Sequence, residues 1–588
     1  MSQQKQKLVS DLRECAQLMA INGENPFRCR AYEQGARTLE GLTGEPGQWI
    51  QEGTLEQTPG VGERLRQKIQ EWVDTGTFEQ LKQLRQQVPA GLLGMMDIPG
   101  LGPRKARQIW REKGIETIDQ LESAARAGTL HDLAGFGERS VQKILAGIRQ
   151  RQQYAERHRL DEAAEAIETV ESRLRPLPEI GRLELAGSCR RACETVKDLD
   201  YVATSDNPKH VMKVFVESPG VQNVIAHGAT KSSVLLGNGL QVDLRVVESE
   251  EFPTALNYFT GSKSHNTRLR GRARQRGWKL NEYGLFEQPE GKDGVGKRIQ
   301  VDSEHQIYDK LGLQYIPPEL REDQGEIEAA EQGRLPELIG QVHMAGVIHC
   351  HSNYSDGRTT ILQMAEACRE AGYHYLVICD HSQSAQYAGG LKPGDVERQM
   401  EEIDRVNQQI KGFRIFKGIE SDIGPEGELD YDDVLLETLD LVIASIHSRM
   451  SMDAETMTRR ICRALEHPAT TILGHPTGRL LLQREPYHLD LEQVIRAAAE
   501  HDVILEINAN PHRLDLDWRY MRMAREVGCR FAINPDAHAT DGIADIRFGV
   551  GVARKGGLTP DTVINTMPAQ AFANWLAQRK RRRFVAAG

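Results

Sequence analysis

The C-terminal half of the chain repeats a pattern that few folds can accommodate. Short apolar segments alternate with amphipathic stretches, and successive apolar segments end in a histidine or an acid. Thus Tyr375–Cys379 is followed by Asp380 and His381, and Phe531–Pro535 by Asp536. Alternating strands and helices predict a parallel β/α fold. Because the carboxyl ends of such strands open on one face of a β/α barrel, the polar residues that follow them should converge there.

Histidine and acidic side chains at or near these strand ends form one candidate site. They are His349, His351, Asp356, His381, Glu420, His447, His475, Asp536 and His538. A single buried histidine is more often structural, but so many ligand-type residues at repeated strand ends favour metal binding. Imidazoles with carboxylates suit zinc, manganese or iron, and two or three such ions would generate hydroxide and hold a phosphate oxygen. We expect hydrolysis of a phosphoester.

The length of the chain implies several domains. At 588 residues it is too long for one core and predicts about four domains. It contains no apolar run long enough to span a bilayer, and its first residues lack the apolar stretch of a signal peptide. We therefore expect a cytoplasmic protein without a membrane partner.

Cysteine usage and charge exclude some classes of protein. The 9 cysteines form no Cys-x-x-Cys pair, which argues against zinc fingers and against a disulfide framework. A net charge of −10 argues against a surface coated with nucleic acid. Two local basic runs remain, at 263–279 and 579–583, and the second is typical of a solvated tail.

A glycine pattern recurs three times in residues 1–150, which otherwise show helical periodicity. Its copies are Thr58–Gly62, Ile98–Gly102 and Leu133–Gly137, each followed by a basic amphipathic segment. The pattern resembles the helix-hairpin-helix. Two glycines let the backbone approach a phosphate, and the amides of the next helix bind it without reading bases. Three copies favour DNA backbone binding over simple turns, through Gly60, Gly62, Gly100, Gly102, Gly135 and Gly137.

The middle of the chain carries three acids in an α/β region. Asp198 and Asp200 are one residue apart on a predicted strand and share a face, because side chains alternate. Asp243 lies on the polar face of an alternating strand. An isolated Asp-x-Asp is usually a solvated strand face, but a trio can hold the two divalent cations of phosphoryl transfer.

Residues 1 to about 322 resemble the family X DNA polymerases. The resemblance rests on Gly-Ser-x-Arg-Arg at 187–191 with Asp-x-Asp at 198–200, Asp243, Tyr-Phe-Thr-Gly-Ser at 258–262, and Asn-Glu-Tyr at 281–283. It implies that the three aspartates bind Mg²⁺ or Mn²⁺ and catalyse transfer of a nucleotide from a dNTP to a primer 3′-hydroxyl.

The same resemblance assigns the nucleotide-binding residues. Gly187, Ser188 and Arg191 match the triphosphate loop. Tyr258, Phe259 and Gly261 match the segment against the incoming sugar, and Asn266 and Arg270 match residues near the nascent base pair.

Three positions in this half depart from, or add to, the family pattern. Ala192 and Lys197 replace glycines of the animal polymerases, so the triphosphate loop is expected to be reshaped. Lys68 stands where animal relatives have a Schiff-base lysine that removes 5′-deoxyribose phosphate, although a lysine on a basic helix is more often a phosphate contact or solvent-exposed.

The strand-end ligands resemble the PHP (polymerase and histidinol phosphatase) domain, with all nine metal positions present. The resemblance implies two to three ions, Mn²⁺ or Zn²⁺, and 3′-5′ exonuclease or 3′-phosphatase activity, with cleavage at abasic sites a further activity of the fused bacterial family. Two alternatives stay open. The C-terminal half could hydrolyse a small phosphomonoester, or the protein could be a scaffold that binds gapped DNA.

The prediction is therefore a multidomain gap-filling polymerase of DNA repair with a PHP nuclease, acting as a monomer on gapped or primer-template DNA. Its expected parts are a helical DNA-binding domain (1–85), a helical fingers-like domain with two hairpins (86–150), an α/β palm (151–255), a thumb-like subdomain (256–325), a linker (326–340), a distorted TIM-like PHP barrel (341–575) and a basic tail (576–588).

Overall fold

The computed structural model describes residues 3–42, 44–58, 60–96, 98, 100–288 and 296–587. Pro59 and Pro99, in the first two glycine patterns, lie outside these residues. The chain divides into two compact units, Met1–Glu156 and Arg157–Gly588. Within the described ranges, no helix is both long and apolar enough to cross a membrane.

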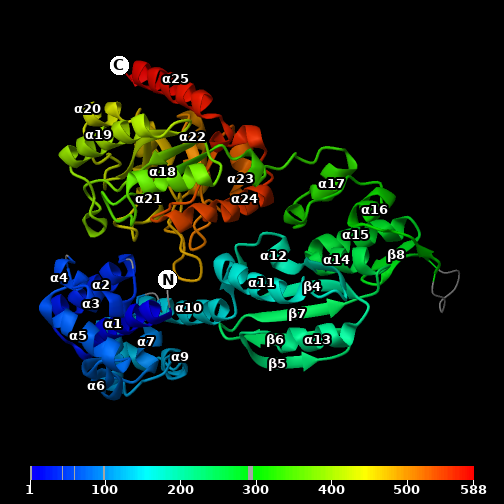
Figure 1. Cartoon of the computed structure of the whole chain (residues 1–588), viewed down its shortest axis with the longest axis horizontal. Helices are drawn as coiled ribbons and strands as arrows, with labels where there is room; N and C mark the ends of the chain where they lie inside the picture. The colour runs from blue at the N-terminus through cyan, green and yellow to red at the C-terminus, as the bar shows by residue number, and fades with distance from the viewer. Residues whose placement is uncertain are drawn as a thin grey trace. The chain divides into compact units, whose positions relative to one another are not determined.

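The first unit is built from helices (Figure 1). They are α1 (Gln3–Asn22), α2 (Pro26–Gly41), α3 (Pro46–Gln51), α4 (Thr54–Gln57), α5 (Glu63–Thr75), α6 (Glu79–Gln87), α7 (Gly91–Met95), α8 (Pro103–Lys113), α9 (Ile118–Arg126) and α10 (Glu138–Ala155). One apolar cluster runs through the unit, from Leu8 and Leu12 in α1 to Ile144 in α10. The two helical segments predicted at 1–85 and 86–150 therefore share a core.

A five-stranded sheet forms the palm at the start of the second unit. Its order is β2-β4-β7-β6-β5, and Figure 1 shows β7, β6 and β5 side by side. The strands are β2 (Ile180–Leu185), β4 (Asp198–Ser205), β5 (Val221–His227), β6 (Lys231–Leu236) and β7 (Gln241–Val246). Helices α11 (Leu160–Leu174) and α13 (Pro208–Val216) pack on the sheet through Val170, Val211 and Phe215.

The next segment forms a thumb around its own apolar cluster. Its elements are α15 (Lys263–Gln275), β8 (Trp278–Asn281), β9 (Gly284–Glu287), β10 (Arg298–Ile299), α16 (Glu304–Lys310) and α17 (Glu326–Glu331). The preceding helix α14 (Phe252–Thr260) belongs to a separate apolar cluster with Ala186 and Val202 of the palm. Helix α17 falls inside the predicted linker. Ile327 and Ala330, three positions apart, lie on one face of α17 and are buried in the thumb cluster, so this polar stretch is folded.

The rest of the second unit is a β/α barrel of seven parallel strands in sequence order. They are β11 (Gly346–Cys350), β12 (Tyr375–Ile378), β13 (Arg414–Asp422), β14 (Leu441–Ser445), β15 (Thr470–Leu473), β16 (Ile504–Asn508) and β17 (Phe531–Asn534). A parallel bridge between Cys350 and Ala537 joins the carboxyl ends of the first and last strands. The predicted fold class, with helical hairpins, an α/β palm with thumb and a TIM-like barrel, is confirmed.

Helices surround this barrel (Figure 1). They include α18 (Ile361–Glu370), α19 (Pro393–Gln409), α20 (Asp433–Thr438), α21 (Ala454–Glu466), α22 (Leu491–Glu500), α23 (Trp518–Glu526) and α24 (Ile546–Lys555). Six of the seven strands are buried along their length, as the apolar runs in the sequence predict, whereas β13 begins with the exposed Arg414.

The basic run near the end of the chain is helical and packed. It belongs to α25 (Ala569–Ala587). Arg579 is buried and donates hydrogen bonds to the carbonyl oxygens of Thr470 and Asp502, and Arg583 donates to those of Leu465 and His467. Cations are favoured beside the free carbonyl groups at the ends of helices, so this run stabilises the barrel instead of trailing in solvent.

Candidate active sites and DNA-binding hairpins

The three palm aspartates share one face of adjacent strands. β4 and β7 run parallel, with Asp200 directly opposite Asp243 and Asp198 opposite Gln241. Each of these side chains is half-buried, while Leu199 and Val242 between them point into the core. The alternation in the sequence thus places all three carboxylates together, as predicted.

The carboxylates of this trio repel one another, and the positive charges of Arg245 and Lys231 offset only part of that repulsion and of the burial. Burial and the carboxylates of Asp198 and Asp243 raise the pKa of Asp200 to about 6. Burial and Asp243 also raise the pKa of Asp198. Gln241 donates a hydrogen bond of 2.8 Å to Asp243, and Lys231 lies 3.9 Å from it. Oxygen ligands that repel one another are the donor set that Mg²⁺ or Mn²⁺ would neutralise, so the residues fit a divalent ion.

The predicted triphosphate loop lies beside these acids. It opens on the short helix α12 (Gly187–Arg190). Gly187 has φ +63°, and a Cβ at this position would lie 2.5 Å from a carboxylate oxygen of Asp200, so a side chain is excluded. Arg191 donates to Glu322 at 2.9 Å and to the carbonyl oxygen of Thr260. Ser188 accepts a hydrogen bond at its carbonyl oxygen from the amide of Cys193.

The residues predicted to meet the sugar and base lie around α14 and α15. Asn266 donates to the carbonyl oxygen of Tyr258 at 2.7 Å, and both line a small cavity with Arg270. Gly261 ends α14 next to Arg191, and Phe259 packs edge-on against Tyr258. The structure therefore brings Tyr258, Asn266 and Arg270 together.

Part of the basic run in the thumb is neutralised within the thumb. Arg268 pairs with Asp323 at 2.9 Å and also with Glu328, and Arg272 pairs with Glu331 at 2.9 Å. Arg270, which lies between these two arginines on α15, instead lines the small cavity near Tyr258.

The barrel ligands converge at the carboxyl ends of the strands, as their positions in the sequence predict. Glu420 lies at the centre, with an oxygen 2.8 Å from His381, 3.0 Å from His475, 3.4 Å from His349 and 3.4 Å from His447. All five side chains are more than nine-tenths buried.

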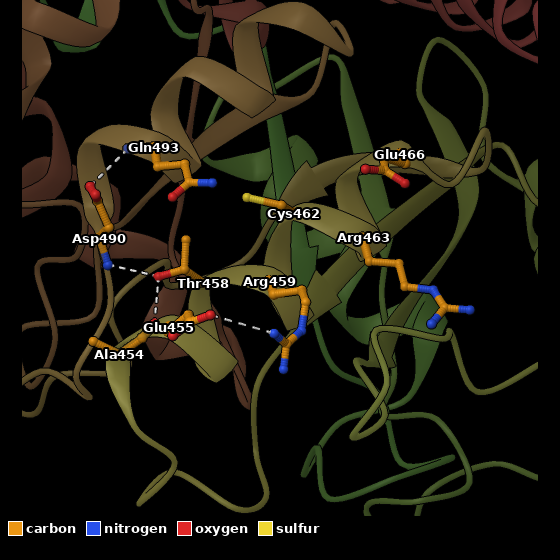
Figure 2. Close-up of a pocket in the computed structure, with 9 residues that line it drawn as sticks. All are labelled: Ala454, Glu455, Thr458, Arg459, Cys462, Arg463, Glu466, Asp490 and Gln493. Carbon is orange, nitrogen blue, oxygen red and sulfur yellow. Dashed lines mark hydrogen bonds and ion pairs between the residues drawn. The ribbon is translucent and has the colours of Figure 1, made fainter.

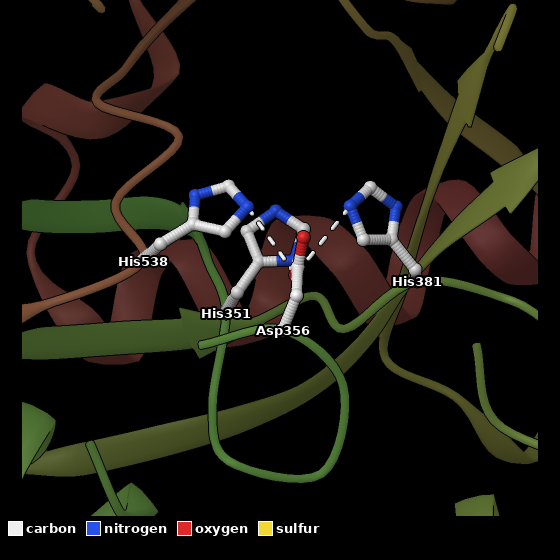
Figure 3. A group of neighbouring side chains, drawn as sticks. All are labelled: His351, Asp356, His381 and His538. Atoms are coloured by element: carbon white, nitrogen blue, oxygen red, sulfur yellow. Dashed lines mark ion pairs between the residues drawn. The ribbon is translucent and has the colours of Figure 1, made fainter. Parts of the chain in front are cut away.

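The remaining ligands complete the site on its open side. His351 lies 3.1 Å from Asp536, and His538 lies 3.3 Å from Asp356. Figure 3 shows the imidazoles of His538 and His381 on either side of the Asp356 carboxylate, with His351 behind it. Asp356 and His538 are about one-third exposed, so this side of the site is open to solvent.

These groups have the ligand atoms and the spacing to hold metal ions. The histidines and acids form three overlapping clusters, and within each cluster the ligand atoms all lie within 4.8 Å of one another. Nε2 of His349 and Nδ1 of His351 are buried and make no hydrogen bond with any residue that the structure describes. Buried ring nitrogens normally have partners, so these donor atoms point to ions.

Two further carboxylates orient the ligands, and neither was predicted from the sequence. Glu506 is fully buried and lies 2.6 Å from Nδ1 of His349, which leaves Nε2 directed at the cluster. Asp422 lies 2.5 Å from Nδ1 of His447 in the same way. Carboxylates commonly fix metal-binding histidines like this. The signal for Glu506 was an acid inside the apolar strand Ile504–Asn508.

A depression elsewhere on the barrel contains none of these residues. It has a volume of about 650 Å³, and Figure 2 shows it between α21 and the start of α22. Its polar groups form hydrogen bonds with one another near the start of α22. The Asp490 side chain accepts a hydrogen bond from the backbone amide of Gln493, and the backbone amide of Asp490 donates one to the Thr458 hydroxyl. The predicted metal ligands lie at the strand ends and do not line this depression.

The three glycine patterns have the same backbone geometry. Gly60, Gly100 and Gly135 have φ between 84° and 86°, a region that favours glycine. Each second glycine is an exposed N-cap with extended backbone and no capping side chain, and a Cβ there would meet nothing within 4 Å: Gly62 before α5, Gly102 before α8 and Gly137 before α10. Open helix starts of this kind can bind phosphate.

Lys68 lies on α5, after the first of these hairpins. It is about a quarter exposed and pairs with Glu71 at 2.9 Å.

Four family models match the chain. They are a helix-hairpin-helix domain over residues 3–78, a SAM-like helix-hairpin-helix tandem over 92–150, the DNA polymerase beta thumb over 255–322 and the PHP domain over 348–510. DNA polymerase/3′-5′ exonuclease PolX of Bacillus subtilis (strain 168) is 38% identical over 564 residues, covering 95% of this chain and 97% of the relative. The chain belongs to the family X DNA polymerases with a C-terminal PHP domain. The predicted function and enzyme class, a DNA polymerase joined to a 3′-5′ exonuclease, are those of this family.

More distant relatives match each half of this family X polymerase separately. DNA polymerase lambda of Rattus norvegicus is 26% identical over 289 residues, which are 45% of this chain and 48% of the relative. A probable phosphatase of Thermoanaerobacter sp. (strain X514) is 28% identical over 240 residues, which are 38% of this chain and 90% of the relative.

Proposed function

We propose that this protein fills short gaps in DNA during repair and trims 3′ ends, with one site for each activity. The observation that carries the proposal is that one unit brings together three carboxylates on adjacent palm strands and, separately, nine histidine and acidic side chains at or near the barrel strand ends. Gapped or primer-template DNA and dNTPs are its substrates, and we propose a monomer acting in the cytoplasm.

At the polymerase site, Asp198 and Asp200 would hold both divalent ions and Asp243 the one nearest the primer. Mg²⁺ or Mn²⁺ bound there would lower the pKa of the 3′-hydroxyl and neutralise the triphosphate. Ser188 and Arg191 would orient the phosphates, and Tyr258 and Asn266 would set the sugar and base beside them. The glycine hairpins would hold the DNA backbone without reading its sequence.

At the PHP site, Mn²⁺ or Zn²⁺ would supply hydroxide for attack on a 3′-terminal phosphodiester. Glu420 would bridge ions, because four histidines surround its two oxygens. The exposed side at Asp356 and His538 would admit the DNA end.

Two narrower proposals concern the helical unit and the domain limits. Lys68 would give a 5′-deoxyribose phosphate lyase, and its pairing with Glu71 equally suits a structural role. We also propose a palm at 151–255 and a PHP barrel at 341–575, a division supported by the positions of the five palm strands (180–246) and the seven barrel strands (346–534).

Paired variants test the proposal. Asp198→Ala or Asp200→Ala should abolish primer extension on a gapped duplex and leave 3′ digestion of single-stranded DNA intact, because their carboxylates belong to the palm alone. His349→Ala should do the reverse. If either folded variant loses both activities, the two sites are not independent.

A second candidate function for the barrel is hydrolysis of a small phosphomonoester. The match of this half to a protein named as a probable phosphatase favours it. A higher kcat/KM on a small phosphate ester than on a DNA 3′ end would support this candidate over the exonuclease.

A further inference from the structure

A buried lysine of the barrel reaches the polymerase's triphosphate loop. Lys555 is the last residue of α24, and its side chain is only 1% exposed. Its ammonium pairs with Glu322 and donates a hydrogen bond of 3.1 Å to the carbonyl oxygen of Arg191. It also lies 4.8 Å from the ring centre of Trp518. A lysine so deeply buried needs its partners, so this contact is a built feature of the fold.

Glu322 stands between the two cations. Its carboxylate accepts from Arg191 at 2.9 Å and also pairs with Lys555. Burial would raise its pKa, but Lys555 and Arg191 outweigh burial and lower it. One carboxylate is thus shared by a guanidinium of the palm and an ammonium of the barrel.

Two more residues of the barrel lie close to the same loop. Ala192 has φ +51°, and a Cβ on Gly551 of α24 would lie 3.2 Å from its methyl group. Arg479, which is buried, pairs with Glu194 at 3.4 Å. The alanine that replaces a family glycine therefore faces a glycine of the barrel helix.

We propose that Lys555 is a positioning residue for nucleotide binding: it keeps the Glu322 carboxylate paired when Arg191 turns from that carboxylate to an incoming triphosphate. The proposal rests on the proposed role of Arg191 in holding the triphosphate.

A buried charge without a partner is costly. With Glu322 only 17% exposed, the departure of Arg191 alone would leave a carboxylate with little water and no counter-ion. Lys555 remains on the other side and neutralises it. The barrel thereby makes the arginine available, and nucleotide affinity at the polymerase site depends on a residue of the nuclease half.

Single-nucleotide gap filling by the full-length protein tests this, with kcat and KM for the dNTP measured in Mg²⁺. Lys555→Met should raise the KM by roughly tenfold or more, since a hydrogen bond to a charged group is lost, with kcat changed by less than about twofold. Lys555→Arg should restore a KM near that of the original protein. Lys417→Met is the matched control, because Lys417 also pairs with an acid, Asp404, at 2.7 Å, on the barrel.

A double-mutant cycle separates this from a general loss of structure. In a Glu322→Gln background there is no buried carboxylate to neutralise, so Lys555→Met should change the KM by less than about twofold. Digestion of single-stranded DNA should be unaltered in Lys555→Met, which shows that the barrel is folded. If Lys555→Met does not fold, Glu322→Gln alone decides, because it should lower the KM by removing a competitor for Arg191.

The results that overturn the proposal are distinct from those that overturn the proposed function. An unmodified protein that fills no gap refutes the polymerase function. A protein that fills gaps, but whose KM is the same in Lys555→Met, or is raised in Glu322→Gln, refutes only the role of Lys555. A tenfold rise in KM that persists in the double variant refutes it as well.

Discussion

Metal binding at the palm should be linked to a proton on Asp200. The pKa of this carboxyl is raised from its ordinary 3.8 to about 6 by burial and by the charges of Asp198 and Asp243. A divalent ion binds the ionised carboxylates, so below about pH 6 it must displace a proton. Metal affinity should therefore fall as the pH falls through this range, and be fully present above it.

The magnitude follows from the proton competition alone. With a pKa near 6, a single proton weakens the metal affinity about tenfold between about pH 8 and about pH 5, whereas a pKa of 3.8 would leave it almost unchanged. Asp198, whose pKa is also raised, adds to the effect in the same direction.

The assay is primer extension by a His349→Ala variant, which silences the nuclease, with the half-saturating Mg²⁺ concentration measured at both pH values. We expect that concentration to be about tenfold or more higher at the lower pH. If it differs by less than about twofold, the carboxylates are not held in the repelling, half-buried arrangement described above, and the account of this site is wrong.

Other predictions follow from single contacts. The pKa of Glu304 is lowered to about 2, because Arg321 and Arg190 outweigh its burial. Its ionised carboxylate should therefore contribute on the order of 3 kcal/mol to the free energy of unfolding above its ordinary pKa, and this contribution is lost as the pH falls toward 2. The Glu304→Gln variant should unfold at a lower temperature than the original protein at neutral pH and at the same temperature in acid. Glu506→Gln should lower the metal affinity of the PHP site by about tenfold or more, measured as metal retained after dialysis, and leave primer extension unchanged. Gly100→Val, at φ +85°, should weaken binding to a gapped duplex by about tenfold in a fluorescence anisotropy titration, whereas full affinity would show that this hairpin does not hold DNA.

Both ligand sets could be predicted from the sequence because each follows a local pattern of residues. Side chains two apart on a strand share a face, which placed Asp198 with Asp200, and the alternation of β7 placed Asp243 beside them. Residues that follow parallel strands meet at one end of a barrel, which is why the sequence alone assigned His381 and Asp536 to one site.

Contacts between distant segments could not be predicted in this way. Lys555 and Glu322 are 233 residues apart, and nothing in the composition of either segment marks them as partners. The polar stretch around Ile327 was predicted to be a linker, because its many acidic residues outnumber the few apolar residues that pack into the thumb. Arg579 was expected in solvent, and its burial depends on carbonyl groups from segments far away in the chain.

The chain should hold separate polymerase and 3′-5′ exonuclease sites. The most direct measurement follows a labelled primer on a single-nucleotide gapped duplex with Mn²⁺, with and without dNTPs. We predict that the primer is extended when dNTPs are present and shortened from its 3′ end when they are absent. A primer that keeps its length in both reactions would contradict the claim and leave a protein that only binds gapped DNA.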